Sequence, residues 1–305
     1  MSATKSGAAK LALVAVLGLV ILKLAVAVLT GSISIFAQTA DSFLDLLAIV
    51  ITFFAIGIAA KPADEEHPFG HGKVENISAV VQAVLIFTTS GLIIYSAVRR
   101  IISKDTLEFT EAGIGVMVVS IVVSLLLSRH LFRVSRATDS PALEAMAHNI
   151  AADVYSAAGV LVGLVVIRFT GLNILDPIVA LAVALIILKT AYDVLRKSFG
   201  GLIDTRLPGA EEAEIMACIT EHSGELVGFH ELRTRKAGSQ RYIDLHLVMH
   251  KSASLEEVHQ MTDHLEQDLE SRLTNTSITI HVEPCGIECE QCSASPDQGQ
   301  SRPSS

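Results

Sequence analysis

The sequence predicts a membrane protein whose six transmembrane helices are followed by a soluble α/β domain. Half of the 305 residues are hydrophobic, and the mean hydropathy of +0.51 is high for a soluble chain of this length. Six long apolar runs lie between Leu11 and about Leu195, whereas the chain after Gly200 is charged and alternates segments of helical and strand period. These features divide the chain into a transmembrane domain at 8–200, a soluble domain at 207–285 and a cysteine-containing tail at 286–305.

The six apolar runs have the length of membrane-spanning helices. An α-helix needs about 20 predominantly apolar residues to cross ~30 Å of hydrocarbon, and every run meets that length. The first run is too long for the apolar core of a signal peptide and lacks a cleavage site of small residues, so we expect it to remain as a span. The expected spans are 9–30, 34–60, 74–102, 111–135, 141–170 and 174–198.

The distribution of Lys and Arg in the short loops predicts that both termini lie in the cytoplasm. Basic residues occur before the first span, after the second, after the fourth and after the sixth, and all of these positions fall on one side. The opposite side holds a neutral turn and Arg168, but also a cluster at Arg99, Arg100 and Lys104 that weakens the assignment without reversing it. We therefore expect a multi-pass protein of a cell inner membrane.

The second span contains two acidic residues, Asp41 and Asp45, that a lipid environment disfavours. A carboxylate near the bilayer centre costs roughly 2.5–3.5 kcal/mol. Positions four apart share one helix face, so the two carboxylates would repel unless one took up a proton or a divalent cation neutralised both. The alternative is that one Asp caps the helix at the interface while the other bonds a neighbouring helix.

The fifth span repeats this spacing with Asn149 and Asp153, which adds a third acid and an amide oxygen. Two helices with matching polar pairs predict a four-ligand metal site made of Asp41, Asp45, Asn149 and Asp153. A regular helix turns His148 partly away from this site, which favours a contact with a neighbouring helix or an aqueous vestibule over ligation. A helix irregularity could still rotate His148 inward.

Four other stretches, together with the D-x-x-x-D of the second span, resemble the cation diffusion facilitator family of metal-ion/proton antiporters. They are "KPADEEHPFGHGK", "GLIDTRLP", "HELRTRKAG" and "IDLHLVMH", and the resemblance extends over residues 8–285. It implies a homodimer in the lipid bilayer that exports divalent transition-metal ions from the cytoplasm in exchange for protons. It also implies a cytoplasmic α/β domain with a metallochaperone-like, ferredoxin-like fold.

One position departs from the pattern of the zinc carriers that this family contains. Those carriers usually have His at the first position of the pair in the fifth span, where this chain has Asn149. Imidazole suits zinc, whereas carboxylate and carbonyl oxygens suit harder ions such as manganese(II), with iron(II) and cobalt(II) intermediate. The substrate is therefore expected within the class of zinc, iron, manganese, cobalt and cadmium, and the preferred ion stays open.

The loop between the second and third spans brings together Asp64, His67 and His71 within eight residues. Pro68 and Gly70 predict a tight turn, and carboxylate and imidazole groups at this spacing can close around a zinc-like ion. The alternative is a solvated loop whose acidic residues keep it off the membrane. The resemblance assigns Asp64, His67 and His71 to a peripheral metal site.

The soluble domain is expected to contain helices at 209–222 and 254–272 and strands at 227–236, 240–250 and 277–283. Alternation places Ile243, Leu245 and Leu247 on the buried face of the second strand, and leaves His246 on the open face. The resemblance implies a regulatory binuclear metal site at the family's matching positions, with His259 nearby and Glu283 where the usual residue is Asp. The matching residues are His230, His246, His281 and Glu283.

The other His and Cys residues give weaker signals. Cys218 is expected in the core of the soluble domain, and three histidines without a match in the family are expected to be solvated: His222, His250 and His264. Three cysteines form a C-x3-C-x2-C run, where a disulfide is not expected on the cytoplasmic side: Cys285, Cys289 and Cys292. The three thiolates could bind a soft metal, and the alternative is a disordered tail.

Together these features predict a secondary transporter and not an enzyme. The sequence has no phosphate loop, hydrolase elbow or kinase signature, and nothing in it predicts binding to nucleic acid. Protons from outside would compete with the metal for the intramembrane carboxylates and so couple the two flows without ATP. The alternative is a metal-sensing scaffold whose membrane domain only anchors and dimerises it, although an anchor has no need of costly intramembrane acids.

Overall fold

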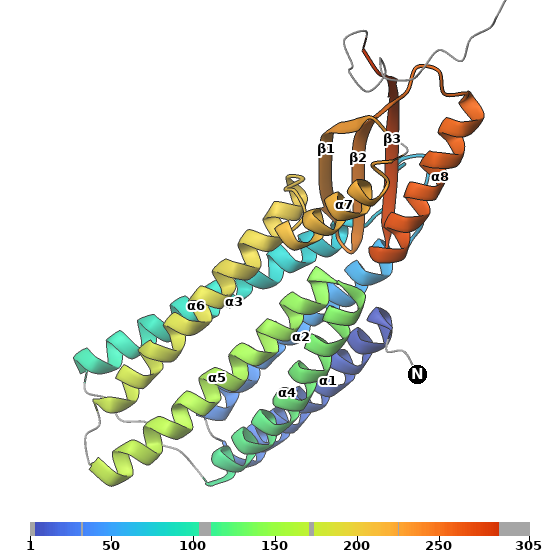
Figure 1. Ribbon diagram of the computed structural model, residues 1–305. Helices are drawn as coiled ribbons and strands as arrows, with labels where there is room; N and C mark the ends of the chain where they lie inside the picture. The colour runs from blue at the N-terminus through green and yellow to red at the C-terminus, as the bar shows by residue number, and fades with distance from the viewer. Residues whose placement is uncertain (1–3, 32, 104–110, 171–173, 225, 287–305) are drawn as a thin grey trace, which may run out of the picture. The chain divides into compact units, whose positions relative to one another are not determined.

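The computed structural model describes residues 4–31, 33–103, 111–170, 174–224 and 226–286. The chain divides into two compact units, residues 1–203 and 204–305, which are described separately below. Figure 1 shows the long helices of the first unit and the small sheet with two shorter helices of the second.

The first unit consists of helices that follow the expected spans closely, which confirms the membrane α-helical class. By length and composition, five helical segments among the described residues can cross a membrane: Lys5–Thr30, Gln38–Ala59, Lys73–Ser103, Ile114–Thr138 and Pro177–Leu202. The helix at Pro141–Thr170 has 30 residues, and Glu144, Asn149 and Asp153 lie in its first half. The helices are α1 (Lys5–Thr30), α2 (Ile33–Ala59), α3 (Lys73–Ser103), α4 (Glu111–Thr138), α5 (Pro141–Thr170) and α6 (Leu175–Leu202).

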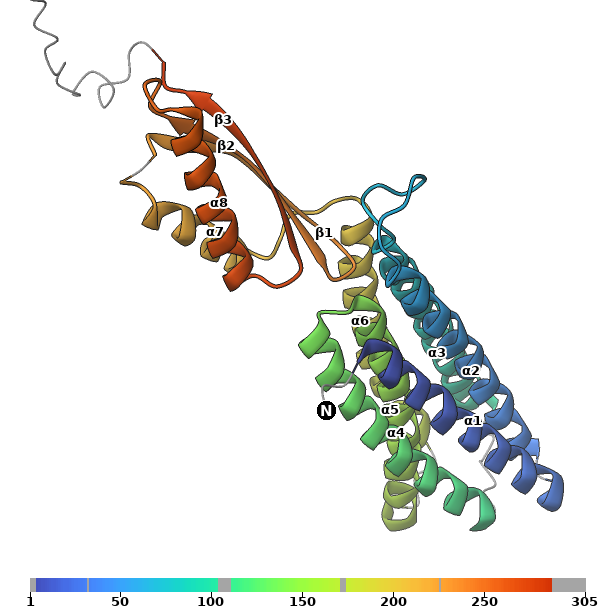
Figure 2. The same cartoon turned by 90° about the vertical axis from the view of Figure 1, so that its right-hand side faces the viewer.

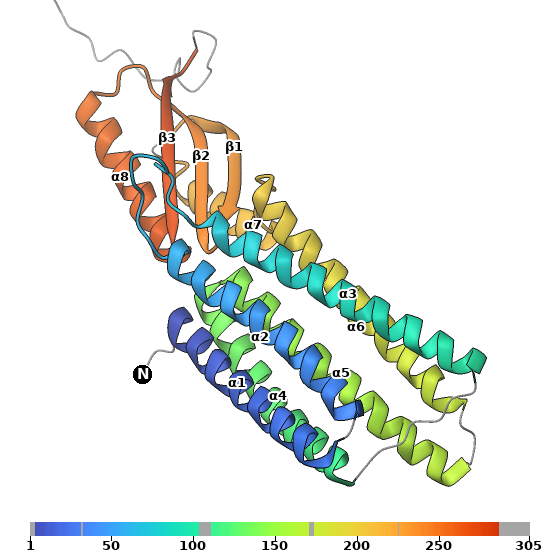
Figure 3. The ribbon, with the colours of Figure 1, turned by 180° about the vertical axis from the view of Figure 1, so that it is seen from behind.

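The six helices form two groups that differ in how they pack. Helices α3 and α6 lie side by side along their length, while α1, α2, α4 and α5 gather into a bundle (Figures 1 and 3). Small residues let the backbones approach closely, as in α1, where Ala8, Ala9 and Ala12 are buried in the core of this bundle. At Gly201 of α6 a Cβ atom would lie 2.2 Å from Asn76 Nδ2 of α3, so any larger residue there would force the Asn76 side chain to shift.

A buried carboxylate, Glu75, joins three helices at one end of the bundle. Its Oε1 lies 2.7 Å from Lys5 Nζ of α1, and its Oε2 accepts a hydrogen bond of 2.5 Å from Ser140 Oγ, just before α5. Glu75 is 3% exposed, so its charge is stabilised by these partners and not by water. The contacts hold α1, α3 and α5 in register, and α5 carries the polar pair.

We expect Glu75→Ala to destabilise the transmembrane unit by about 1–3 kcal/mol, because it leaves the buried Ser140 hydroxyl without its acceptor. Thermal unfolding of the purified protein in detergent measures the effect as a lower Tm. Glu66→Gln, in an exposed loop, is the matched control and should shift the stability by no more than about 0.5 kcal/mol. Equal Tm values for Glu75→Ala and the wild type would contradict a structural role for this carboxylate.

The second unit is a three-stranded sheet covered on one face by two helices. The elements are α7 (Gly209–Glu221), β1 (Gly228–Ala237), β2 (Gln240–Met249), α8 (Leu255–Arg272) and β3 (Thr276–Pro284). The strand order is β1-β2-β3, with β1 antiparallel and β3 parallel to β2. A tight turn at Gly238, with a φ of 62°, joins the hairpin, and α8 forms the crossover from β2 to β3.

Helices cover only one face of the sheet, so polar side chains of the strands can lie on the other face. Both helices pack on the same side of the sheet, as Figure 2 shows. Their apolar residues, such as Ile215 of α7 and Leu265 of α8, form one core with Ile243, Leu245 and Leu247 of β2. The alternation expected for β2 is therefore confirmed, and the opposite face of the sheet is open.

Candidate metal sites

The two intramembrane pairs meet through a hydrogen bond between α2 and α5. The Nδ2 of Asn149 donates to Oδ1 of Asp45 at a distance of 3.1 Å. The amide group must turn its NH2 toward an ionised carboxylate, which only accepts hydrogen bonds, so the amide oxygen remains the acceptor of that side chain. Asp153 interacts electrostatically with both Asp45 and Asp41. The structure thus places the four candidate ligands in one polar region.

This polar region is looser than a closed coordination sphere. Among the described residues, three groups of His, Cys, Asp or Glu have ligand atoms within 4.8 Å of one another, and the aspartates Asp41, Asp45 and Asp153 are not among them. Binding one ion through all three carboxylates would require their side chains to rotate toward a common point. The geometry therefore shows neighbouring ligands from two helices, held together by the bond between Asn149 and Asp45.

A basic residue that the sequence interpretation missed belongs to the same region. The Nζ of Lys23, from α1, donates a hydrogen bond of 2.6 Å to Ser42 Oγ of α2. Its charge also acts on Asp41, Asp45 and Asp153. The signal in the sequence was a single Lys in the middle of the first apolar run, which is as costly in lipid as the aspartates.

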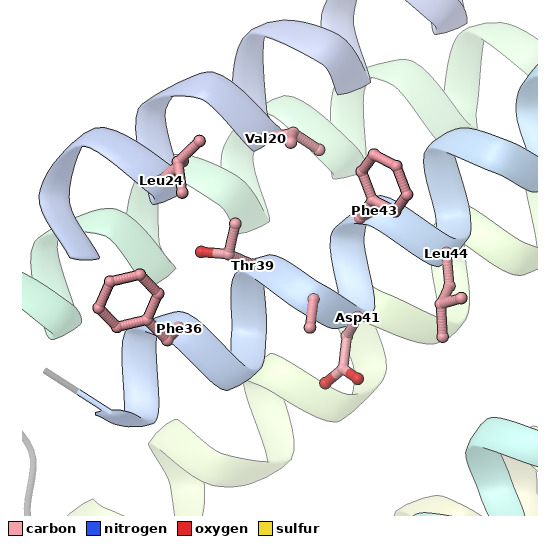
Figure 4. Close-up of a pocket in the computed structure, with 8 residues that line it drawn as sticks. Val20, Leu24, Phe36, Thr39, Asp41, Phe43 and Leu44 are labelled. Carbon is pink, nitrogen blue, oxygen red and sulfur yellow. The ribbon is translucent and has the colours of Figure 1, made fainter. Parts of the chain in front are cut away.

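A pocket of about 520 Å³ lies beside this region. Its lining residues come from α1 and α2 (Figure 4). Apart from Thr39 and Asp41, its lining is apolar and includes Val20, Leu24 and Phe36. The Asp41 carboxylate points away from the α1 residues that line the pocket. Apart from Asp41, whose carboxylate points away from α1, the lining offers no carboxylate or imidazole to a metal ion, so we place the candidate metal site on the carboxylate side of α2 and not in this pocket.

His148 contacts another helix. Its ring packs edge-on against Phe132 of α4, with the ring centroids 4.8 Å apart. This is the helix contact that the sequence interpretation favoured over ligation. The neighbouring Asn149 is the residue of this turn that reaches α2.

The loop between α2 and α3 brings its three expected ligands together. The ligand atoms of Asp64, His67 and His71 lie within 4.8 Å of one another. The two Asp64 oxygens lie 3.2 Å from His67 Nδ1 and 3.3 Å from His71 Nε2. A hydrogen bond from the His67 backbone N–H lowers the pKa of the Asp64 carboxyl, which favours the ionised form that a metal ion requires.

Three histidines form one row across the open face of the sheet. Strand register pairs His230 of β1 with His246 of β2, and His246 with His281 of β3. Neighbouring ring centroids are 5.2 and 4.7 Å apart. Because residues in register on adjacent strands lie side by side, the sheet itself holds these imidazoles together.

Glu283 lies within reach of all three imidazoles of this row. Its carboxylate oxygens lie 2.8 Å from His246 Nδ1, 3.3 Å from His230 Nε2 and 3.6 Å from His281 Nε2. The hydrogen bond from His246 lowers the pKa of the Glu283 carboxyl. The ligand atoms of His230, His246 and Glu283 lie within 4.8 Å of one another, which is the spacing that a single metal ion requires.

The sequence interpretation missed Glu231, which joins this group through a β-bulge. The pairing of β1 with β2 shifts between His230 and Arg233, and Glu231 takes a φ of 51°. The irregularity directs its carboxylate to within 3.7 Å of His246 Nε2. Bulges often re-aim a side chain beside a functional site, but no periodic pattern in the sequence reveals one.

One expected ligand, His259, lies apart from the histidine row in the protomer. His259 is on α8, one of the helices that cover the opposite face of the sheet, and its Nδ1 lies 3.4 Å from Asp263 Oδ1. Cys285, directly after β3, is buried and disulfide-bonded, so the expectation that the C-x3-C-x2-C run forms no disulfide is wrong. Cys289 and Cys292 lie outside the described residues.

The third group of converging ligand atoms lies between α7 and α8. It consists of Cys218, His222 and Asp268. Cys218 is buried, as expected, but His222 is only 8% exposed, so the expectation that it is solvated is wrong. His222 ends α7 as its C-terminal cap, and its side chain turns back onto the helix to contact the Cys218 carbonyl oxygen.

Comparison with known proteins covers both units. Residues 9–203 match the family model described as "Cation efflux transmembrane domain", and residues 207–285 match "Cation efflux protein, cytoplasmic domain". The chain is 33% identical over 263 residues to the "Uncharacterized transporter sll1263" of Synechocystis, covering 86% of this chain and 85% of that protein. It is 33% identical over 258 residues to the "Cation-efflux pump FieF" of Yersinia pestis, covering 85% of each chain. A solved structure whose title names CzrB is 37% identical and covers 26% of this chain and 99% of its own, with a TM-score of 0.26.

Proposed function

The chain belongs to the cation efflux family, and from this premise we propose that it works as a homodimer that exports a divalent transition-metal ion in exchange for protons. The family and the apolar helices make it a multi-pass membrane transporter of metal cations. The counter-ion, the preferred metal and the dimer are the parts that we propose. We also propose that both termini face the cytoplasm of a cell inner membrane.

The observation that carries the proposal is the hydrogen bond between Asn149 and Asp45. It joins two helices that each carry a polar pair at a spacing of four residues, at a depth where hydrophobic side chains would cost less. A binding site for an ion that must enter and leave gives a reason to retain such residues. A loose arrangement of the carboxylates also suits transport, because the ion must be released on the far side.

The formal charges of this region suit a divalent ion. Three ionised carboxylates and the Lys23 ammonium leave a formal charge of two negative units among Asp41, Asp45, Asp153 and Lys23. One divalent cation neutralises that charge, and so do two protons. We therefore propose that metal and protons bind alternately, and that two protons exchange for each metal ion.

The donor set favours a harder ion than zinc. The proposed ligands are carboxylate and amide oxygens, which suit manganese(II) better than zinc(II), with iron(II) and cobalt(II) intermediate. We propose that manganese or iron is preferred, and that zinc and cadmium are weaker substrates. Asn149 decides this preference because it stands where an imidazole would favour zinc.

Flux in proteoliposomes tests the transport proposal. Purified protein is reconstituted with a metal-sensitive dye or a pH-sensitive dye trapped inside, and manganese, iron, cobalt or zinc is added outside. We expect metal uptake together with proton efflux, at about two protons per metal ion. Metal uptake without proton movement would reject the exchange. Metal binding without any uptake would instead support the metal-sensing scaffold.

The histidine row is proposed as a regulatory metal site of the cytoplasmic domain. His230, His246, His281 and Glu283 would hold metal on the open face, with Glu231 at its edge and His259 contributed from elsewhere in the dimer. The loop group of Asp64, His67 and His71 is proposed as a peripheral site. Two acidic copies of the cytoplasmic domain repel without metal, and bound metal would reduce that repulsion. Cytosolic metal would thus draw the two copies together and activate transport.

We expect His246→Ala to prevent the metal-induced approach of the two cytoplasmic domains. His246 is central to the row, because it contacts Glu283 at 2.8 Å and lies between the other two imidazoles. The metal concentration for half-maximal transport should rise about 10-fold or more, while the rate at saturating metal stays within about twofold. Distances between spin labels, with and without metal, measure the approach.

His259→Ala is the informative comparison for this variant. His259 is 72% exposed and lies outside the row within the protomer. An effect equal to that of His246→Ala would place His259 in the site through the second protomer, whereas no effect would remove it from the site. If His246→Ala still closes normally with metal, the regulatory site lies elsewhere.

A further inference from the structure

The interface of α7 and α8 carries metal-ligating side chains that the proposed function does not use. Helix α7 contributes Cys218 and its C-terminal cap residue His222, and helix α8 contributes His264 and Asp268. The members of each pair are four residues apart, so each helix presents its pair on one face. Two helices that pack against each other therefore bring one thiol, two imidazoles and one carboxylate to the same place.

Three of these groups have ligand atoms close enough together to surround one small metal ion, and the exposed His264 side chain would turn toward them to complete a set of four. The ligand atoms of Cys218, His222 and Asp268 lie within 4.8 Å of one another. Asp268 Oδ2 lies 3.2 Å from His222 Nε2 and 3.8 Å from His264 Nε2. In a tetrahedral zinc site with bonds of ~2.0–2.3 Å, the ligand atoms are about 3.3–3.8 Å apart.

A hydrogen bond settles which nitrogen of His222 is available. His222 Nδ1 lies 2.9 Å from the Cys218 carbonyl oxygen, which can only accept, so Nδ1 carries the proton. In the neutral imidazole, Nε2 then carries a lone pair and is an acceptor. It faces the Asp268 carboxylate, which is also an acceptor. Two acceptors at 3.2 Å need either a proton on Nε2 or a metal ion between them, and this position offers the Nε2 lone pair and the carboxylate to such an ion. Metal-binding histidines commonly have their second nitrogen held in this way by a carbonyl oxygen.

The cluster is enclosed on one side and accessible on the other. Cys218 is fully buried in the core between the sheet and the helices, and His222 is nearly so. The side chain of His264 is 59% exposed and that of Asp268 is 38% exposed, which gives an ion a path from solvent. The rings of His222 and His264 are in edge contact, with centroids 5.0 Å apart.

We infer that Cys218, His222, His264 and Asp268 form a zinc-class metal site that ties α7 to α8. One thiolate, two imidazoles and one carboxylate make a tetrahedral set of the kind that binds zinc, cobalt(II) or cadmium. The site is distinct from the histidine row, because the two helices cover the opposite face of the sheet. Its softer ligands set it apart from the oxygen-rich transport site, so it would hold a resident ion and not the cargo.

Cobalt(II) added alone to the purified full-length protein in detergent provides the test, because a thiolate–cobalt bond absorbs in the near ultraviolet. We expect the wild type to develop this charge-transfer band and to saturate it at one cobalt ion per chain. Cys218→Ser should lose the band. Asp268→Asn, which keeps the shape of the side chain, should weaken cobalt binding by about 10–100-fold. Asp263→Asn, on the same helix, is the matched control and should bind as the wild type does.

Each result either supports the site or rejects it. No band in the wild type would mean that a protonated His222 pairs with Asp268 and that no metal binds. A band that persists in Cys218→Ser would come from the cysteines of the tail and would reject the site. If Cys218→Ser fails to fold, the comparison of Asp268→Asn with Asp263→Asn decides, and equal cobalt affinities would overturn the inference. Transport is not the readout, so the result is independent of the proposed function.

Discussion

Asp45→Ala is expected to abolish metal uptake into proteoliposomes together with the proton efflux that accompanies it. Asp45 accepts the hydrogen bond from Asn149 and interacts electrostatically with Asp41 and Lys23, so it connects all parts of the intramembrane group. Its removal takes away a proposed ligand and the acceptor that orients the Asn149 amide. We expect the initial rates of both fluxes to fall by about 100-fold or more.

Asp45→Asn separates the loss of charge from damage to the fold. The Asn side chain has the shape of Asp and can still accept the hydrogen bond from Asn149, but it carries no charge. We expect this variant to be as inactive as Asp45→Ala and as stable as the wild type in thermal unfolding. Asp45→Ala should be slightly less stable, because the buried Asn149 amide then lacks an acceptor.

Thr39→Val is the matched control on the same helix. Thr39 is buried, and among the contacts described its hydroxyl donates to the Ile35 carbonyl oxygen of its own helix, so Val keeps the branched shape and removes a bond within the helix and not one to the polar region. Both fluxes should persist in this variant. Metal transport that survives Asp45→Asn at the rate of the control would remove Asp45 from the mechanism and with it the proposed site.

Local periodicity explains why most of the fold could be predicted from the sequence. Hydropathy gives the helices of the first unit because a lipid environment demands long apolar stretches. Alternation in β2 places His246 on the face of the sheet that Ile243 and Leu245 do not occupy. The sheet register then adds His230 and His281 to the row. These inferences need only the neighbours of a residue along its own helix or strand.

The residues that the sequence interpretation missed depend on contacts between elements. Glu231 reaches His246 only because β1 bulges and its backbone takes a positive φ, which no alternation encodes. His222 was expected to be solvated, but it is buried. Its burial results from the packing of α8 against α7, which the sequence of α7 alone does not reveal. The spacing of four residues was visible in C-x3-H and H-x3-D, but the sequence alone does not say which two helices pack together.

Asn149→His is expected to change which metal the transporter prefers. Asn149 is 5% exposed and faces Asp45 across the interface of α2 and α5, so a side chain at this position reaches the proposed metal site. An imidazole there replaces an oxygen ligand by a nitrogen ligand, which favours zinc over manganese. We expect the ratio of zinc to manganese uptake rates in proteoliposomes to rise about 10-fold or more.

Asn149→Asp is the control that separates the effect of a nitrogen ligand from the effect of merely substituting residue 149. It keeps an oxygen ligand and adds a negative charge, so the ratio of zinc to manganese uptake should not rise, although both rates can change. If Asn149→His leaves the ratio unchanged, the side chain at 149 does not select the metal. His148→Ala then becomes the deciding variant, because a fall in zinc uptake in it would mean that His148 leaves its contact with Phe132 and acts as the nitrogen ligand. If Asn149→His raises the ratio of zinc to manganese uptake and His148→Ala leaves it unchanged, the metal preference depends on the Asn149 amide of α5.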